Sequence, residues 1–541
     1  MESVLVIGSG ASEVHFALSL LKKGYQVSML DVGMDKPAPV NPSDSFQSLK
    51  TNLDDPAAYF LGEEFEAVVL PSLHGDYVTK YYGFPPSKNH VFTQAAGFDY
   101  RATGFVPLLS FARGGLAEAW TGGAYPYNDD ELKDYPFKYN DIEPYYSEVA
   151  KRIGLIGVND DMARFFPLHD NLLEPLRLDE NSRLLVEGYQ ENKSYINNKL
   201  RCYLGRSRVT TQSVDTAERK GCTYCGRCLW GCPSESLYTP SITLRECMRY
   251  PNFNYVPGMY VSHFQYGQDR RVQAVVAESI QDHTQYEFTA DRYALAAGTM
   301  SSSKIFIDSI YRQTGQIVKL TGLMDNRQVL IPFVNLRMMG VSYNAQSYQY
   351  HQLAIGLEAA DKPEEYLHGQ ITTLKTALVH PVIQNLPFDT ATSRQVFRNL
   401  RSGLGVVNLN LFDRRRECNY VSAQVDNQSN KTKLVINYTP SEDEPILLKE
   451  AIHKIKQLLW KLKCIVPPGM LQIRPMGASV HYSGIMPMSE NPAPFHTSKY
   501  CQSHDFENLY IVDGSSMPFL PAKNITFTLM ANAIRIAESK F

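Results

Sequence analysis

Four cysteines stand close together in the chain, at Cys222, Cys225, Cys228 and Cys232, and a proline follows the last of them. Their spacing, C-x2-C-x2-C-x3-C-P, is that of the bacterial ferredoxin run, in which thiolates hold an iron–sulfur cluster. Closely spaced thiolates can wrap one corner of such a cluster. The run therefore predicts an iron–sulfur centre (4Fe-4S or 3Fe-4S) with these four residues as metal ligands.

Other interpretations of the cysteine run stay open. A four-iron cluster on a single run needs either Cys232 or a remote thiolate such as Cys202 or Cys247, because the fourth cysteine of a ferredoxin run serves a second cluster. Zinc also takes four thiolates, usually from two separated C-x2-C pairs, and thiols without a metal can simply pack in a core. A disulfide framework ranks last, because thiols stay reduced inside cells.

The N-terminus has the pattern of a dinucleotide-binding unit. Residues 3–7, SVLVI, are typical of a buried strand, and the turn Gly8-Ser9-Gly10 leads into the apolar-periodic segment VHFALSLLKKG. A second strand, QVSML, ends at Asp31, about 20 residues beyond the glycines, where such folds place an acid on a ribose hydroxyl. The start of the helix offers free N–H groups to a pyrophosphate. Gly8, Gly10 and Asp31 are therefore predicted cofactor-binding residues.

Glu13 conflicts with this pattern. It stands where the fingerprint has its third glycine, so its bulk disturbs close packing of helix on strand. Its charge would also lie near an anionic phosphate. Either the helix begins at a different residue, or the affinity for the dinucleotide is weakened.

Distant stretches of the chain fit one family pattern. These stretches are RGGLAEAWTGGAYPYN (113–128), YALAAGTMSSSKIFIDS (293–309), HYSGIMPM (481–488) and NLYIVDGSSMPFLPAKNITFTLMANAIRIAESKF (508–541). Together with the N-terminal turn, they resemble the glucose-methanol-choline (GMC) family of flavin-dependent oxidoreductases. The resemblance covers the flavin half of the chain and fades over about 311–465, where that family is most variable.

The resemblance implies FAD as the cofactor and assigns residues to it. Gly114, Gly115 and Trp120 would lie in the loop that lines the flavin ring system. Val261 corresponds to the position that holds the adenine through its backbone, and Asp513 and Gly514 would approach the ribityl chain and the pyrophosphate. Some bacterial GMC dehydrogenases for sugars and polyols also resemble this chain in carrying a cysteine cluster whose iron–sulfur centre relays electrons outward.

His481 and Asn524 match the two active-site positions of the family. Oxidation of an alcohol moves a hydride to the flavin and a proton to a base, and an imidazole has a pKa suited to that proton transfer. His481 stands where the family has its active histidine. Asn524 occupies the partner position, where an amide can hydrogen-bond the substrate oxygen but cannot act as the base.

These residues need a discontinuous scaffold to bring them together. We expect an α/β fold, α+β overall, in which residues 1–150, 200–310 and 466–541 form a Rossmann-like FAD-binding domain, with an antiparallel meander in 255–290. Residues 151–199 and 311–465 would form the substrate domain. There the strand-like stretches QVLIPFVNLRMM, HGQITTLKTALV and LGVVNLNLFD predict an antiparallel sheet, and PILLKEAIHKIKQLLWKLK has the period of a helix that backs it.

Composition and charge limit the classes of molecule that the chain is expected to bind. The 541 residues carry 53 basic and 56 acidic side chains, a net charge of −3, and dispersed basic residues argue against nucleic acid. No window offers the roughly 18 uncharged apolar residues of a transmembrane helix, and the first residues lack a signal peptide pattern, so a cytoplasmic location is expected. Aromatic residues in YYGF (81–84) and FARGG (111–115) are candidates to line a sugar pocket.

The sequence leaves three alternative functions open. The first is an FAD-dependent dehydrogenase that oxidises a hydroxyl of a sugar, polyol or related biosynthetic intermediate and passes electrons through an iron–sulfur cluster to an electron-acceptor protein or a quinone. The second is an oxidase that uses dioxygen and needs no relay. The third, which Glu13 favours, is a catalytically degenerate flavoprotein or scaffold.

Overall fold

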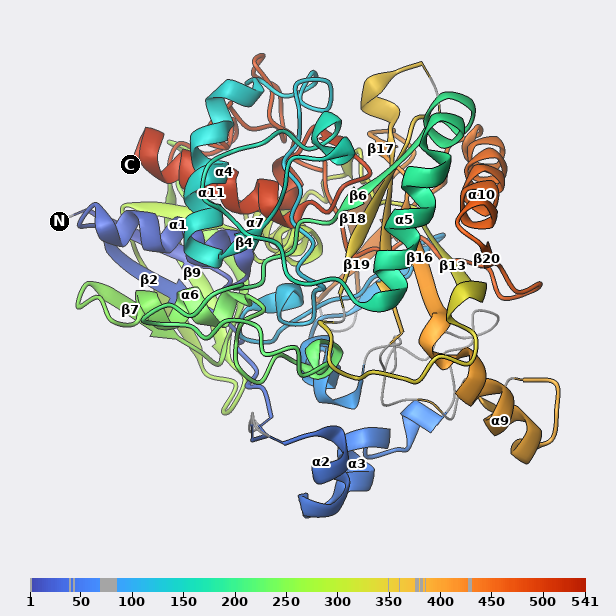
Figure 1. The fold of residues 1–541 in the computed structure, drawn as a ribbon. Coiled ribbons are helices and arrows are strands. Elements are labelled where there is room, and N and C mark those ends of the chain that lie inside the picture. The colour runs from blue at the N-terminus through green and yellow to red at the C-terminus, as the bar shows by residue number, and fades with distance from the viewer. Residues whose placement is uncertain are drawn as a thin grey trace.

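Short buried strands from distant parts of the chain form one parallel sheet in the order β22-β11-β1-β2-β7 (Figure 1). The strands are β1 (Ser3–Ile7), β2 (Gln26–Leu30), β7 (Phe253–Val256), β11 (Arg292–Leu295) and β22 (Leu509–Ile511). The structure is a computed structural model and describes residues 2–541 apart from 38–39, 42–43, 69–84, 349, 360, 375–378, 380–382, 385 and 427–430. The expected Rossmann-like sheet is present, and the two ends of the sequence meet in it.

Different layers cover the two faces of this sheet. Val4 and Val6 of β1 pack in a core with helices α1, α4, α6 and α11, whereas Leu5 and Ile7 pack in a second core with α7 and an antiparallel meander. The helices are α1 (Ala11–Lys22), α4 (Tyr139–Ile153), α6 (Pro240–Cys247), α7 (Thr299–Thr314) and α11 (Thr526–Lys540), and the meander is β8 (Met259–Tyr266), β9 (Val272–Ser279) and β10 (Gln285–Phe288). The meander expected in 255–290 is thus confirmed.

A second, larger sheet stands beside the first and is antiparallel, in the order β20-β13-β16-β15-β14-β6, with β21 also paired to β13. Its strands are β6 (Cys202–Arg206), β13 (Gln328–Asn335), β14 (Leu353–Leu357), β15 (Leu367–Thr373), β16 (Leu404–Asn410), β20 (Cys464–Ile465) and β21 (Gln472–Ile473). One face packs against α5 (Glu180–Tyr195) and α10 (Glu444–Lys461), as Figure 1 shows. The expected antiparallel sheet backed by helices is therefore present.

Strand pairing crosses the expected domain boundaries in four places, and in two of these both strands have four or more residues. β6 pairs with β14 of the large sheet, although residues 200–310 were assigned to the FAD-binding domain. β3 (Tyr100–Thr103) pairs with β19 (Thr432–Asn437), in a four-stranded sheet with β12 (Leu320–Thr321) and β18 (Tyr420–Val425). The division into domains remains a prediction, but these strands connect its two parts.

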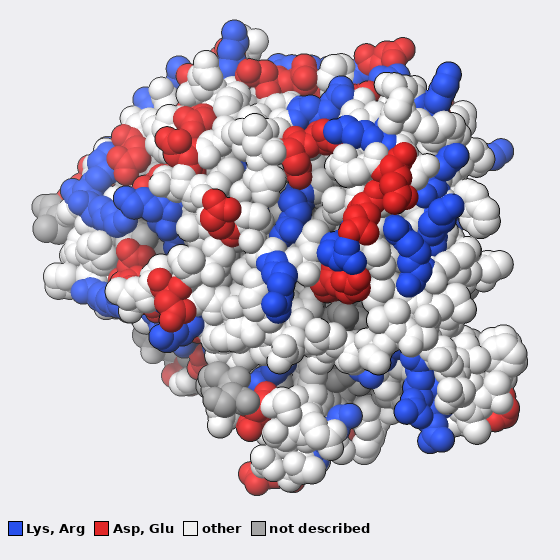
Figure 2. Space-filling model, viewed as in Figure 1, with Lys and Arg blue, Asp and Glu red and all other residues white. Residues whose placement is uncertain are grey.

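Shorter elements complete the described chain. They are α2 (Phe46–Asn52), α3 (Pro56–Leu61), α9 (Thr390–Leu400), β4 (Leu155–Ile156), β5 (Leu172–Leu173), β17 (Asp413–Arg414) and β23 (Phe519–Leu520). On the face drawn in Figure 2, acidic and basic side chains are interspersed. No helix in the described part of the chain combines the length and the apolar character that crossing a bilayer requires.

Candidate active site

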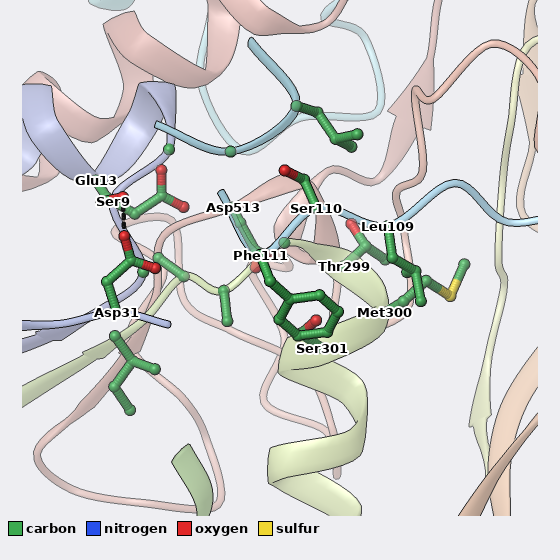
Figure 3. A pocket seen from close by; sticks show the side chains of 18 of the residues that line it. Ser9, Glu13, Asp31, Leu109, Ser110, Phe111, Thr299, Met300, Ser301 and Asp513 are labelled. Carbon is green, nitrogen blue, oxygen red and sulfur yellow. Dashed lines mark hydrogen bonds between the residues drawn. The ribbon is translucent and has the colours of Figure 1, made fainter. Parts of the chain in front are cut away.

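A pocket opens where the strands of the parallel sheet end (Figure 3). Its lining includes the residues that directly follow β1, β2, β11 and β22, together with the 108–117 loop and the start of α11. In open α/β folds this edge is where a dinucleotide binds. Of the predicted cofactor residues, the lining contains Gly8, Gly10, Asp31, Gly114, Gly115, Val261, Asp513 and Gly514.

The turn after β1 requires its glycine. Gly8 has a φ of +109°, and a Cβ at this position would lie 2.6 Å from the carbonyl oxygen of Ala296. The hydroxyl of Ser9 donates to the carboxylate of Asp31 and accepts from the backbone N–H of Gly114 at 2.9 Å. These contacts join the ends of β1 and β2 to the 108–117 loop, so three predicted segments meet at one point.

Trp120 differs from its predicted role. Its indole N–H donates to the carbonyl of Tyr238 at 2.7 Å, and the residue does not belong to the pocket lining. Its ring also packs edge-on against that of Tyr238. Trp120 therefore holds the end of its loop against Tyr238 and does not face the pocket. The aromatic stretch at 81–84 lies outside the described residues, whereas Phe111 does line the pocket.

Glu13 lies in the pocket wall. Helix α1 begins at Ala11 with Gly10 as its N-cap, which is the ordinary position, so the alternative that the helix begins elsewhere is wrong. Burial raises the pKa of Glu13 well above its usual range, and it also raises the pKa of Asp31, to about 6, and that of Asp513. The glycine turn, the helix N-terminus and Asp31 at the end of β2 fit FAD, with Glu13 as the unusual member of the site.

His481 is buried beside this pocket, between the lining residues Val480 and Tyr482. Its Nδ1–H donates to the side-chain oxygen of Asn326 at 2.8 Å. The amide of Asn326 has a fixed orientation, because its N–H2 group donates to the carbonyls of Leu411 at 2.7 Å and Pro521 at 3.0 Å. The Nε2 atom of His481 is then the one without a proton, and burial lowers the pKa of the imidazole to about 4. A neutral imidazole in this tautomer can accept a proton.

A buried carboxyl holds the loop that carries His481. Asp325 accepts hydrogen bonds from the backbone N–H groups of Gly477 at 2.6 Å and His481 at 3.3 Å, and also from the hydroxyl of Ser479. Burial raises the pKa of Asp325 to about 7. Asp325 and Asn326 thus fix both the backbone and the ring of His481.

Asn524 is connected to the large sheet. The side-chain N–H2 of Gln370 donates to the Oδ1 atom of Asn524, which leaves the N–H2 group of Asn524 as its donor. The same Gln370 amide lies 3.4 Å from Nε2 of His368. Burial is the main cause that lowers the pKa of His368. Asn326, which holds the ring of His481, donates to the carbonyls of Leu411, directly after β16, and Pro521, three residues before Asn524. The two predicted catalytic residues therefore border the same end of this sheet.

Alternate residues give the large sheet one apolar face and one face that carries a polar patch. Ile371, Val407 and Leu409 point into the core with α5 and α10. The polar sheet face consists of the residues on the other side that register brings together: Gln328, His368, Gln370, Asn408 and Asn410. Three buried atoms of this face have no hydrogen-bond partner among the described residues, namely Gln370 Oε1, Asn408 Oδ1 and Asn410 Nδ2. Buried polar atoms normally have partners, so these three are suited to a polar ligand.

The cysteine run forms a loop away from the pocket. Cys222, Cys228 and Cys232 pack against one small apolar cluster, and no disulfide joins any of the nine cysteines, all of which lie in the described part of the chain. The described residues contain no group of three or more side chains placed to hold a metal ion. The sulfur of Cys222 accepts from the N–H of Tyr224, and that of Cys232 accepts from the N–H of Leu237, each at 3.4 Å.

Neither remote cysteine belongs to the cluster around the run. Cys202 packs between the large sheet and its helices, and Cys247 packs against α1. Cys232 and Trp230 line a second cavity of about 1320 Å³, which shares Leu108 and Leu109 with the lining of the pocket.

Sequence reasoning did not identify Asn326 or the polar sheet face. The alternation of His368, Gln370 and Thr372 with apolar or small residues was a signal that one side of this strand is polar. No local pattern marked Asn326, because its role depends on carbonyls almost 90 and 200 residues away in sequence.

Comparisons with known proteins agree with this site. Residues 415–533 match the GMC oxidoreductase family model, as its C-terminal domain. The chain is 21% identical to 6'''-hydroxyparomomycin C oxidase of Streptomyces lividus and 21% identical to paromamine 6'-oxidase of Streptomyces fradiae, in each case over 99% of this chain and 90% of the relative.

Solved structures share the fold. Pyridoxine 4-oxidase from Mesorbium loti superposes with a TM-score of 0.59 at 12% identity, over 100% of this chain and 99% of the other. A formate oxidase variant from Aspergillus oryzae superposes with a TM-score of 0.61 at 12% identity, over 99% and 97%. The chain thus carries a GMC oxidoreductase C-terminal domain, and it shares its fold with solved oxidases over nearly its whole length.

Proposed function

We propose that this GMC-type flavoenzyme oxidises a hydroxyl group of a sugar, a polyol or a related small molecule to a carbonyl. The observation that carries the proposal is the polar sheet face, which contacts Asn524 through Gln370 and ends next to Leu411, a partner of the Asn326 amide that holds His481. A substrate with several hydroxyl or amino groups would satisfy donors and acceptors at this face, whereas a simple apolar alcohol would leave them unpaired. The names of the two relatives, 6'''-hydroxyparomomycin C oxidase and paromamine 6'-oxidase, support this substrate class.

The residues of the chain divide the chemistry between them. His481 Nε2 takes the hydroxyl proton of the substrate, because its Nδ1–H is committed to Asn326. Asn524 donates its N–H2 group to the same substrate oxygen, because its own oxygen accepts from Gln370. When bound, FAD accepts the hydride from the carbon that carries this hydroxyl. The C–H and O–H bonds break, the C=O bond forms, and the proton remains on the imidazole.

The test is reduction of bound flavin by sugars and amino sugars in the absence of dioxygen. The wild-type chain should bleach its flavin absorbance with at least one polyhydroxylated substrate. His481→Ala should keep the flavin but reduce it about 100-fold more slowly. His453→Ala, which removes an exposed imidazole from α10, should match the wild type.

Two outcomes would contradict the proposal. Reduction of the His481→Ala flavin at near-normal rate would remove His481 as the base. A chain that binds no flavin would instead support the scaffold alternative.

A second form of the proposal adds an electron relay. Backbone N–H groups donate to the sulfurs of Cys222 and Cys232, and such donors stabilise thiolates in iron–sulfur sites. A cluster at the four cysteines would pass electrons to an acceptor protein or a quinone, whereas an oxidase, as the relatives are named, returns electrons to dioxygen. The expected cytoplasmic location likewise stays a prediction.

Iron and sulfide analysis after anaerobic purification separates these forms. With a relay, iron copurifies, and Cys225→Ser abolishes it while flavin reduction in a single turnover is unchanged. Cys418→Ser, at an exposed isolated cysteine, serves as the matched control. Iron-free protein that consumes dioxygen with substrate would establish the oxidase form and leave the run as packing thiols.

A further inference from the structure

Glu13 occupies the first turn of α1, at the point where the helix faces the cofactor pocket (Figure 3). Its side chain folds back over the glycine turn, so a Cβ built on Gly10 would lie 2.7 Å from its Oε2 atom. The residue is 4% exposed. A carboxyl group therefore stands inside the site where the helix N-terminus and the glycines would receive a diphosphate.

Within the described part of the chain, no cation is among the groups that act on Glu13. Asp31 approaches from the end of β2 and Asp513 from the turn after β22, and the charges of both raise the pKa of Glu13 further. On α7, the ammonium of Lys304 pairs with Asp308 at 2.8 Å. In the 113–118 loop, the carboxylate of Glu118 accepts from the backbone N–H of Ser241 at 2.9 Å. The local hydrogen bonds to Glu13 come from its own backbone and from Ser12.

An ionised Glu13 and a diphosphate could not share this space without strong repulsion in a site of low dielectric. A protonated carboxyl behaves differently, because it has one O–H donor. A hydrogen bond from a neutral O–H to an anionic phosphate oxygen is short and strong. The protonated form thus turns the conflicting residue into a ligand.

We propose that Glu13 binds the diphosphate of FAD as a neutral carboxylic acid that donates a hydrogen bond to a phosphate oxygen, so that the chain loses flavin as the pH rises. The inference rests on FAD as the cofactor and is independent of the substrate. The sign follows from proton linkage. Below the pKa of Glu13 in the flavin-free protein, binding needs no proton uptake. Above it, each binding event takes up one proton, and affinity falls by up to tenfold per pH unit.

The experiment is titration of flavin-free protein with FAD, followed by quenching of flavin fluorescence, from about pH 5.5 to about pH 9. The variants are Glu13→Gln, which keeps an N–H donor without a titrating proton, and Glu13→Met, which is similar in length but has no donor. At the acidic end, the wild type should bind FAD as tightly as Glu13→Gln and about tenfold more tightly than Glu13→Met. At the alkaline end, the wild type should fall at least tenfold below Glu13→Gln.

Asp31 also titrates in this pocket, with a pKa of about 6, and it is retained in all three proteins, so the difference between the wild type and Glu13→Gln reports the effect of replacing Glu13. Far-UV circular dichroism and melting of the flavin-free proteins check that each variant is folded. Parallel pH profiles for the wild type and Glu13→Gln would overturn the inference while leaving FAD as the cofactor. Tighter binding by Glu13→Met than by the wild type at every pH would also overturn it, because Glu13 would then only obstruct. Failure of every variant to bind FAD at any pH would overturn both the inference and the cofactor assignment.

Discussion

At the scale of single residues, the proposed role of His481 as a base depends on an amide, that of Asn326, which does not itself titrate. Asn326 can present only its oxygen to the imidazole, because both of its N–H bonds are directed to main-chain carbonyls. The imidazole is thereby held in one tautomer, and burial keeps it neutral. Asn326 is a positioning residue that acts through His481.

This arrangement gives a pH dependence that differs from that of a free histidine. Burial lowers the pKa of His481 to about 4, so the acid limb of the kcat/KM profile should lie near pH 4 and not near the ordinary value of about 6.5. Asn326→Asp places a carboxylate against Nδ1, which favours the imidazolium and should move the acid limb upward by at least one pH unit. Asn326→Leu should instead lower the maximal rate about tenfold. An acid limb that stays in place in Asn326→Asp would exclude His481 as the titrating base.

At the scale of elements, alternate side chains of strand β15 lie on opposite faces of the large sheet and have different roles. Its apolar set, with Leu367 and Ile371, attaches the sheet to α5 and α10, and its polar set, with His368 and Gln370, faces the reaction site. The pairing register adds a neighbour from β16 to this polar set, because Gln370 is directly opposite Asn408. One strand thus connects the stability of the large sheet to the recognition of a substrate.

Substitutions on the polar sheet face should separate binding from catalysis. Asn408→Leu removes an unpartnered acceptor, so the KM for a polyhydroxylated substrate should rise about tenfold while kcat changes little. Gln370→Leu removes the donor to Asn524 as well, so kcat should fall together with a rise in KM. Gln395→Leu, at an exposed amide on α9, is the control and should change neither. Unchanged KM in both sheet variants would mean that the substrate binds elsewhere.

Much of this architecture could be predicted from sequence, but only where the signal is local. The β-branched run at 3–7, the glycine turn and Asp31 predict their own structure, since neighbouring residues determine it. The Asn524 to Gln370 contact joins residues 154 positions apart and depends on how two sheets meet. Prediction is limited even within a motif. The sequence shows that Glu13 replaces the third glycine of the dinucleotide-binding pattern, but it does not show that the side chain folds back over Gly10.

At the scale of the whole molecule, a buried ion pair fixes the segment that carries Asn524. The ammonium of Lys523 contacts Glu131 and donates to the carbonyls of Pro126 at 2.9 Å and Phe165 at 2.6 Å. Neither partner of the pair is more than 1% exposed. Three segments that are far apart in sequence therefore converge next to a predicted catalytic residue.

Removing the ammonium of Lys523 should lower the stability of the protein. Lys523→Met leaves the carboxyl of Glu131 buried and unpaired, which should lower stability by about 3–5 kcal/mol, measurable as a lower melting temperature. The double variant Lys523→Met with Glu131→Gln should recover much of that loss, because no buried charge remains. An equal loss in the single and double variants would show that packing, and not charge, dominates this site.

The strand order of the parallel sheet also determines when, during synthesis of the chain, the cofactor pocket can form. β22 pairs with β11, and α11 packs along α1, so the site around Asp513 is assembled from residues near both ends of the sequence. During translation, β1, the glycine turn and α1 leave the ribosome hundreds of residues before their neighbours exist. The nascent chain must therefore wait for residues 509–540 before it can retain a nucleotide, and chaperones would meet a domain whose apolar strands stay unpaired until synthesis has passed that point.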